Sequence, residues 1–180
     1  MAKVAFSALG DYALALERYQ SAADSGKMLE RAIATGAAIV ADQIRANLQA
    51  LPEEKFRKLQ SGETFRGLPK NQKQDLADSF GLTPIGRDKN GFLHTKAGFD
   101  GYGRRPTKQY PHGVPNQLLA RAVESGSSVR EKTPFVRPAV AKSKKAAVEA
   151  MQAEIDKETE RLMDLVGLDR RLRLSYPHEM

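Results

Sequence analysis

The chain has 180 residues, of which 41% are hydrophobic and 28% are charged, a composition typical of a globular protein with one continuous core. It contains no cysteine, which excludes disulfides, thiolate metal sites and cysteine nucleophiles. It also lacks an apolar run of about 18 residues, so we expect no transmembrane helix, and the first residues do not predict a secretory signal. The net charge of +7 is concentrated in residues 52–145, which hold nineteen Lys or Arg and nine Asp or Glu. Such a basic segment suits a polyanion or an acidic protein partner, and a solvated surface explains it equally well.

The N-terminal part predicts a short strand over residues 4–9 and then a helix that Asp11 can cap. A clearer helix follows residue 26 and ends at Pro52. Its apolar residues recur at spacings of three and four, and Gly36 within this stripe predicts close packing of another element. The stripe consists of Leu29, Ile33, Gly36, Val40, Ile44, Leu48 and Leu51.

The middle of the chain predicts shorter elements. Residues 53–60 suggest a helical turn within a polar, basic segment, and residues 74–80 suggest a short helix ended by Gly81. Residues 82–85 and 92–95 flank an Asn90-Gly91 pair, which strongly favours a β-hairpin. Residues 98–115 are rich in Gly, Pro, Tyr and Arg and show little periodicity, which is typical of a functional or mobile loop.

The last third predicts a helix of two to three turns over residues 116–125 that closes at Gly126. Residues 133–137 are β-prone, and Pro138 suits the first turn of a final helix that reaches residue 166. These elements predict an α+β fold in which long N-terminal and C-terminal helices pack on a small antiparallel β-sheet with a hairpin. We expect a single domain over residues 1–167 and a C-terminal extension over residues 168–180.

The glycine-rich stretch after residue 97 offers candidates for contact with a partner or a neighbouring subunit. It matches neither phosphate-binding glycine motif, because the required Lys and Ser/Thr or the strand–helix context are missing. Aromatic and arginine side chains in a glycine-rich loop are instead suited to anchoring an interface. The candidates are Phe99, Tyr102, Arg104, Arg105 and Tyr110.

Two short patterns, VESGSS at residues 123–128 and PFVRPA at residues 134–139, are the most informative part of the chain. Their order resembles a signature of the head–tail joining or tail-completion (neck) proteins of long-tailed bacteriophages, the lambda gpZ-like family. Residues 75–81 are similar to the helix that precedes the hairpin in that family, and the resemblance extends along most of residues 10–165. The loop over residues 99–115 is longer than expected, and the segment beyond Gly167 has no counterpart. The signature residues are Glu124, Gly126, Ser127, Pro134, Phe135, Arg137 and Pro138.

The resemblance implies a structural virion protein of the neck or tail top, made in the cytoplasm of the host bacterium. It implies a homo-oligomeric ring of six copies whose neighbours are the head-closure connector, the tail terminator and the tail tube, with no cofactor and no membrane. Within the signature, two prolines pin the backbone around Phe135, whose ring can be buried, and Arg137 can reach a carboxylate, with Glu124 as one candidate.

Two other functions stay open at this stage. Lys142, Lys144 and Lys145 begin the last helix and could contact packaged DNA or an acidic partner, so a basic accessory protein with sequence-independent phosphate contacts is the main alternative. An enzyme is the third reading and the weakest, since the three histidines stand in unlike contexts without paired acid and base residues.

Overall fold

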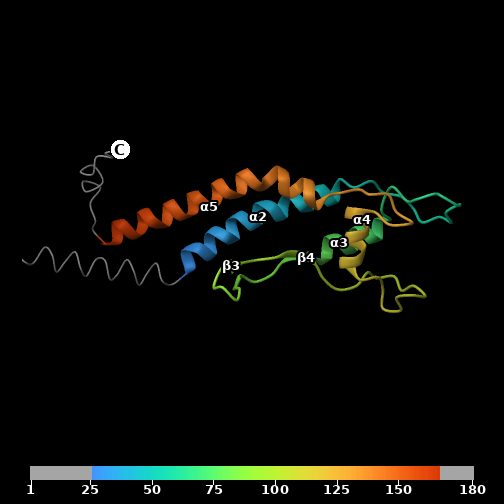
Figure 1. The fold of residues 1–180 in the computed structure, drawn as a ribbon, viewed down its shortest axis with the longest axis horizontal. Helices are drawn as coiled ribbons and strands as arrows, with labels where there is room; N and C mark the ends of the chain where they lie inside the picture. Colours follow the sequence, from blue (N-terminus) through green and yellow to red (C-terminus); the bar gives the residue numbers. More distant parts are fainter. Residues whose placement is uncertain (1–25, 167–180) are drawn as a thin grey trace, which may run out of the picture.

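The computed structural model describes residues 26–166 and confirms the α+β fold, with long helices at both ends of the described region (Figure 1). The strand and helix predicted over residues 4–19 lie outside these residues, as does the segment 168–180. The described helices are α2 (Lys27–Gln49), α3 (Lys70–Ser79), α4 (Asn116–Ser125) and α5 (Val136–Val166), and the strands are β1 (Phe80–Leu82), β2 (Gly86–Arg87), β3 (Leu93–His94) and β4 (Ala97–Phe99).

Helices α2 and α5 lie side by side along their length and form an elongated arm (Figure 1). Gly36, Ile44 and Leu48 of the predicted apolar stripe are buried, whereas Leu29 is 47% exposed, so the stripe prediction is wrong at its first residue. The predicted close approach at Gly36 is confirmed: a Cβ built there would lie 2.6 Å from the Met151 side chain and 3.2 Å from the Ala147 carbonyl oxygen. The two helices can therefore approach closely because Gly36 has no side chain.

The core lies at one end of this arm, where α3, α4 and the β1–β4 pair pack against the end of α2 and the start of α5. We call this end the head. Phe135 lies at its centre, and its ring packs against that of Phe99 at a centroid distance of 5.9 Å. Phe99 is thus buried within its own chain, and the prediction that it anchors a subunit interface is wrong for this conformation.

The predicted hairpin is present and is longer than expected. β1 pairs antiparallel with β4, and β2 pairs antiparallel with β3 farther out. The turn is closed by Asp88, whose carboxylate accepts hydrogen bonds from the N–H groups of Asn90 and Phe92. Gly91 adopts a φ of 82°, which explains the Asn-Gly pair at this position. The hairpin runs back from the head along α2 (Figure 1).

Two local predictions are wrong. Residues 53–60 are not helical: the segment is extended, and Glu53 bridges to Leu68 while the Glu54 carboxylate accepts hydrogen bonds from the N–H groups of Arg66 and Gly67. Residues 133–137 form no strand, since α5 begins at Val136. In both segments, a carboxylate paired with distant backbone N–H groups decides the local structure.

Candidate assembly site at the signature segment

Glu124 occupies the last turn of α4 and points to the beginning of α5. Its carboxylate accepts hydrogen bonds from the N–H groups of Phe135, Val136 and Arg137, at 2.7, 2.8 and 3.0 Å. The first N–H groups of a helix have no partner inside the helix, and a negative charge there interacts favourably with the helix dipole. Glu124 therefore caps α5 from another helix, a role that sequence spacing alone does not reveal.

The other signature residues complete the same joint. Phe135 is fully buried, as predicted, and its carbonyl accepts a hydrogen bond of 2.9 Å from the Asn47 side chain of α2. The expected pairing of Arg137 with Glu124 is confirmed at 3.6 Å between Nε and Oε1. Pro138 lies in the first turn of α5, where a missing N–H has little effect. Together these residues determine the position at which α5 begins and extends away from the head.

Gly126 and Ser127 form the turn between the two halves of the signature. Gly126 ends α4 with a φ of 81°, as its predicted role as a helix stop requires. The backbone N–H groups of Ser127 and Arg130 donate to each other's carbonyl oxygens, at 2.9 and 3.3 Å, and this closes a tight turn. The N–H of Thr133 then donates to the carbonyl of Val123 and returns the chain to α4.

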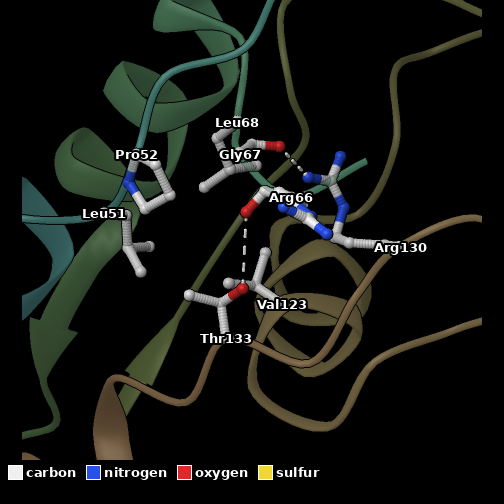
Figure 2. Close-up of a pocket in the computed structure, with 8 residues that line it drawn as sticks. All are labelled: Leu51, Pro52, Arg66, Gly67, Leu68, Val123, Arg130 and Thr133. Carbon is white, nitrogen blue, oxygen red and sulfur yellow. Dashed lines mark hydrogen bonds between the residues drawn. The ribbon is translucent and has the colours of Figure 1, made fainter. Parts of the chain in front are cut away.

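Arg130 is a buried residue that the sequence reasoning did not single out. Its guanidinium donates to the Gly67 carbonyl (Figure 2). The guanidinium also lies 5.9 Å from the centre of the Phe65 ring. Burial lowers the pKa of this guanidinium from its usual value. The cavity beside it has a volume of about 10 Å³, which accommodates one water molecule at most. Arg130 therefore fastens the turn to the 65–68 segment, and the cavity is too small for a ligand.

The predicted contact residues in the loop differ in their exposure and in whether they already have partners within the chain. Tyr102 is exposed to 63% and can reach a partner. Arg104 is committed within the chain, since its backbone N–H donates to Asp75 at 3.1 Å and its side chain pairs with Asp75 and Asp78. Arg105 is exposed, and Tyr110 is half-buried in a turn with Thr107. The loop is therefore tied to α3 at its start and exposed beyond it.

Arg105 also borders a surface pocket of about 520 Å³ between the loop, the start of α3 and the 53–56 segment. The pocket is lined by Glu53, Glu54, Lys55, Phe56, Pro69, Lys70, Asn71 and Arg105. Its charged side chains are of both signs, so it favours no single class of small molecule.

Lys142, Lys144 and Lys145 are all exposed on the first half of α5. Only Lys145 has an acidic partner among the described residues, Glu149 at 3.8 Å on the next turn. These lysines remain available for an external partner.

Within residues 26–166, no group of three or more His, Asp or Glu side chains could hold a metal ion. None of the helices in the same range combines the length and the hydropathy needed to cross a membrane. Comparisons of the chain with models of protein families, with curated proteins and with solved structures gave no match.

Proposed function

We propose that this protein is a structural component of the neck or tail top of a long-tailed bacteriophage, where it assembles as a ring and joins or completes the tail. The proposal starts from the sequence resemblance of most of residues 10–165 to the tail-completion family. The geometry of the signature segment then supports it.

The observation that carries the proposal is the joint around Glu124. The resemblance selects Glu124, Phe135 and Arg137 from two neighbouring patterns, and in the fold the Glu124 carboxylate bonds to both of the other residues. If the two short patterns resembled the family only by chance, we would not expect them to select residues that bond to each other in the fold. A joint that sets the direction of a long helix suits an assembly protein.

The exposed apolar side chains also favour an assembly role. Large apolar side chains stand at four separate loops of the described chain: Phe56, Phe92, Tyr102 and Val129. Phe92, at the hairpin turn, is exposed to 70%. Exposed aromatic residues are enriched where a protein surface becomes buried against partners, and a ring subunit has neighbours on several sides.

The test is to silence this gene in the phage that carries it and to examine the lysate by electron microscopy. We expect filled heads and separate tails, or tails of abnormal length, and recovery of joined particles when the wild-type gene is supplied in trans. A signature variant, Glu124→Ala, should complement poorly, whereas Glu131→Ala, which changes an exposed carboxylate, should complement fully. Normal infectious particles from the silenced phage would refute the proposal.

The second candidate is a basic accessory protein that contacts nucleic acid. The exposed Lys142, Lys144 and Lys145 favour it, and replacing all three by alanine should then reduce the slope of log affinity for duplex DNA against log salt concentration by about three. The acidic residues that follow on the same helix argue against it, because they would repel a phosphate backbone lying along α5.

A further inference from the structure

Helix α5 has opposite charge in its two halves. Residues 136–148 contain four basic and no acidic residues, whereas residues 149–166 contain six acidic and two basic residues. A helix has a positive N-terminal end and a negative C-terminal end, so the arrangement that stabilises an isolated helix is the reverse of this one. The charge order of α5 therefore needs an explanation outside the helix itself.

Some of these charges form one stripe on the surface of α5. They recur at spacings of three, four and seven residues, which places them on a single face, and all of them are exposed. This face lies opposite the one that is buried against α2 at Ala139, Ser143 and Ala147. The stripe consists of Lys142, Lys145, Glu149, Asp156 and Glu160.

The chain itself offers little to neutralise this stripe. Lys145 and Glu149 approach to only 3.8 Å, and Asp156 accepts a hydrogen bond from the neutral Gln152. Lys142 and Glu160 have no ion-pair partner among the described residues. Val148 is exposed beside the basic part of the stripe and adds an apolar contact point.

We propose that the stripe is a contact surface between copies of this chain, in which the basic half of α5 in one copy lies against the acidic half of α5 in the next. A surface that is positive at one end and negative at the other is complementary to a shifted copy of itself. α5 has 31 residues and is therefore about 46 Å long, so a half overlap juxtaposes about four turns. Such a head-to-tail contact uses each half of the helix with a different neighbour, as a closed ring requires. This inference rests on the proposed ring-forming function and assigns its subunit contact.

The experiment compares charge-reversal variants of the full-length chain by sedimentation velocity at low salt, at about 20 mM, and at about 0.5 M, where exposed ion pairs are screened. One variant carries Lys142→Glu and Lys145→Glu, so that all five residues of the stripe are acidic. The other carries Asp156→Lys and Glu160→Lys, so that every residue of the stripe except Glu149 is basic. Lys89→Glu with Lys96→Glu is the matched control for the first variant, because it makes the same charge change on the hairpin.

We expect the wild-type chain to self-associate at low salt and to lose this association at high salt. Each α5 variant alone should associate at least about tenfold more weakly than the wild type, and an equimolar mixture of the two should recover association. The hairpin control should behave like the wild type. Circular dichroism checks that each variant remains helical.

Association that is unchanged in both α5 variants, or a mixture that does not associate, would overturn the proposed contact, as would a wild type that stays monomeric at every concentration. If the acidic variant loses DNA binding and the mixture of the two variants does not regain self-association, the lysines contact nucleic acid instead. The particle phenotype of the silenced phage is read independently, so the contact can fail while the neck function stands.

Discussion

A single carboxylate decides where the last helix begins. Glu124 satisfies three N–H groups that α5 cannot satisfy itself, and it does so from a different helix. Because its side chain is 12% exposed, solvent cannot easily replace these hydrogen bonds. The contribution of this residue to stability should therefore come from capping more than from its ion pair with the exposed Arg137.

We predict that Glu124→Ala lowers the free energy of unfolding by about 1–2 kcal/mol, the usual effect of losing a helix cap. Arg137→Ala removes the ion pair with Glu124 and a 3.5 Å hydrogen bond to the Ser125 hydroxyl, and because the Arg137 side chain is 67% exposed it should cost less than about 1 kcal/mol. Urea denaturation of the two variants measures both values. Equal losses in the two variants would mean that the ion pair, and not the cap, holds the joint.

The lowered pKa of the Glu54 carboxyl predicts that part of the free energy of unfolding is lost at acidic pH. The N–H of Gly67, then that of Arg66, and the nearby Arg57 hold the pKa of its carboxyl below the usual value of 4.5. A carboxyl whose pKa is lower in the folded state stabilises the fold above its unfolded pKa, and this stabilisation disappears as the pH falls through the folded pKa.

The free energy of unfolding of the wild type should therefore exceed that of Glu54→Gln at neutral pH, and the difference should shrink as the pH falls below 4.5. Urea titrations at several pH values measure it. Asp42→Asn, which changes an exposed ion pair on α2, is the control and should have little effect at neutral pH. A difference that is independent of pH would rule out this role of Glu54.

At the scale of elements, the contact of α2 with α5 depends on one glycine. A Cβ at position 36 would lie 2.6 Å from the Met151 side chain, which is closer than atoms can approach without movement. Alanine also favours the helix over glycine by about 1 kcal/mol, so packing and helix propensity act in opposite directions at this position.

A double-mutant cycle separates the two effects. We predict that Gly36→Ala destabilises the wild-type chain by about 1–2 kcal/mol, because a well-packed contact becomes overpacked. In a Met151→Ala background the same change should be less destabilising by about 1 kcal/mol or more, because the clash with Met151 is gone and the helix propensity of alanine is opposed only by the 3.2 Å approach to the Ala147 carbonyl oxygen. The free energies of unfolding of the four proteins test this, and an equal effect of Gly36→Ala in both backgrounds would contradict it.

The elements that were predicted correctly are those whose signal is local. The apolar periodicity of α2, the Asn90-Gly91 turn and the helix stop at Gly126 all depend on residues close in sequence. The errors arise where distant groups decide. In residues 53–60, the Glu54 carboxylate bonds to the backbone N–H of Gly67 and no helical turn forms. In residues 133–137, the strand is replaced by the start of α5 at Val136, which Glu124 caps.

The candidate site was predictable to the same extent. The pairing of Glu124 with Arg137 and the burial of Phe135 follow from the signature residues, which lie near one another along the chain. The burial of Phe99 and Arg130 does not, since Phe99 packs against Phe80 across the β1–β4 pair and Arg130 bonds to Gly67, 63 residues earlier. Nothing in the glycine-rich loop or in the turn signals these contacts.

At the scale of the whole molecule, the core is distributed unevenly. The buried apolar cluster lies in the head, from Ala41 on α2 to Ala139 on α5. Farther along the arm the buried residues of α2 are small, as at Ala32 and Gly36. Local stability follows the amount of apolar surface that is buried, so the arm should open more readily than the head.

Hydrogen exchange followed by mass spectrometry can measure this gradient. We predict that backbone amides in residues 28–38 and 150–160 exchange faster than those in residues 41–48 and 137–147, although all four segments are helical. Because the outer half of α5 carries the acidic part of the stripe, assembly should slow exchange in residues 150–160 if the proposed contact between copies forms. If the chain assembles and exchange in residues 150–160 does not slow, the proposed contact between copies is wrong. The stability gradient would still hold, because it depends on the core alone and not on the charges of the stripe.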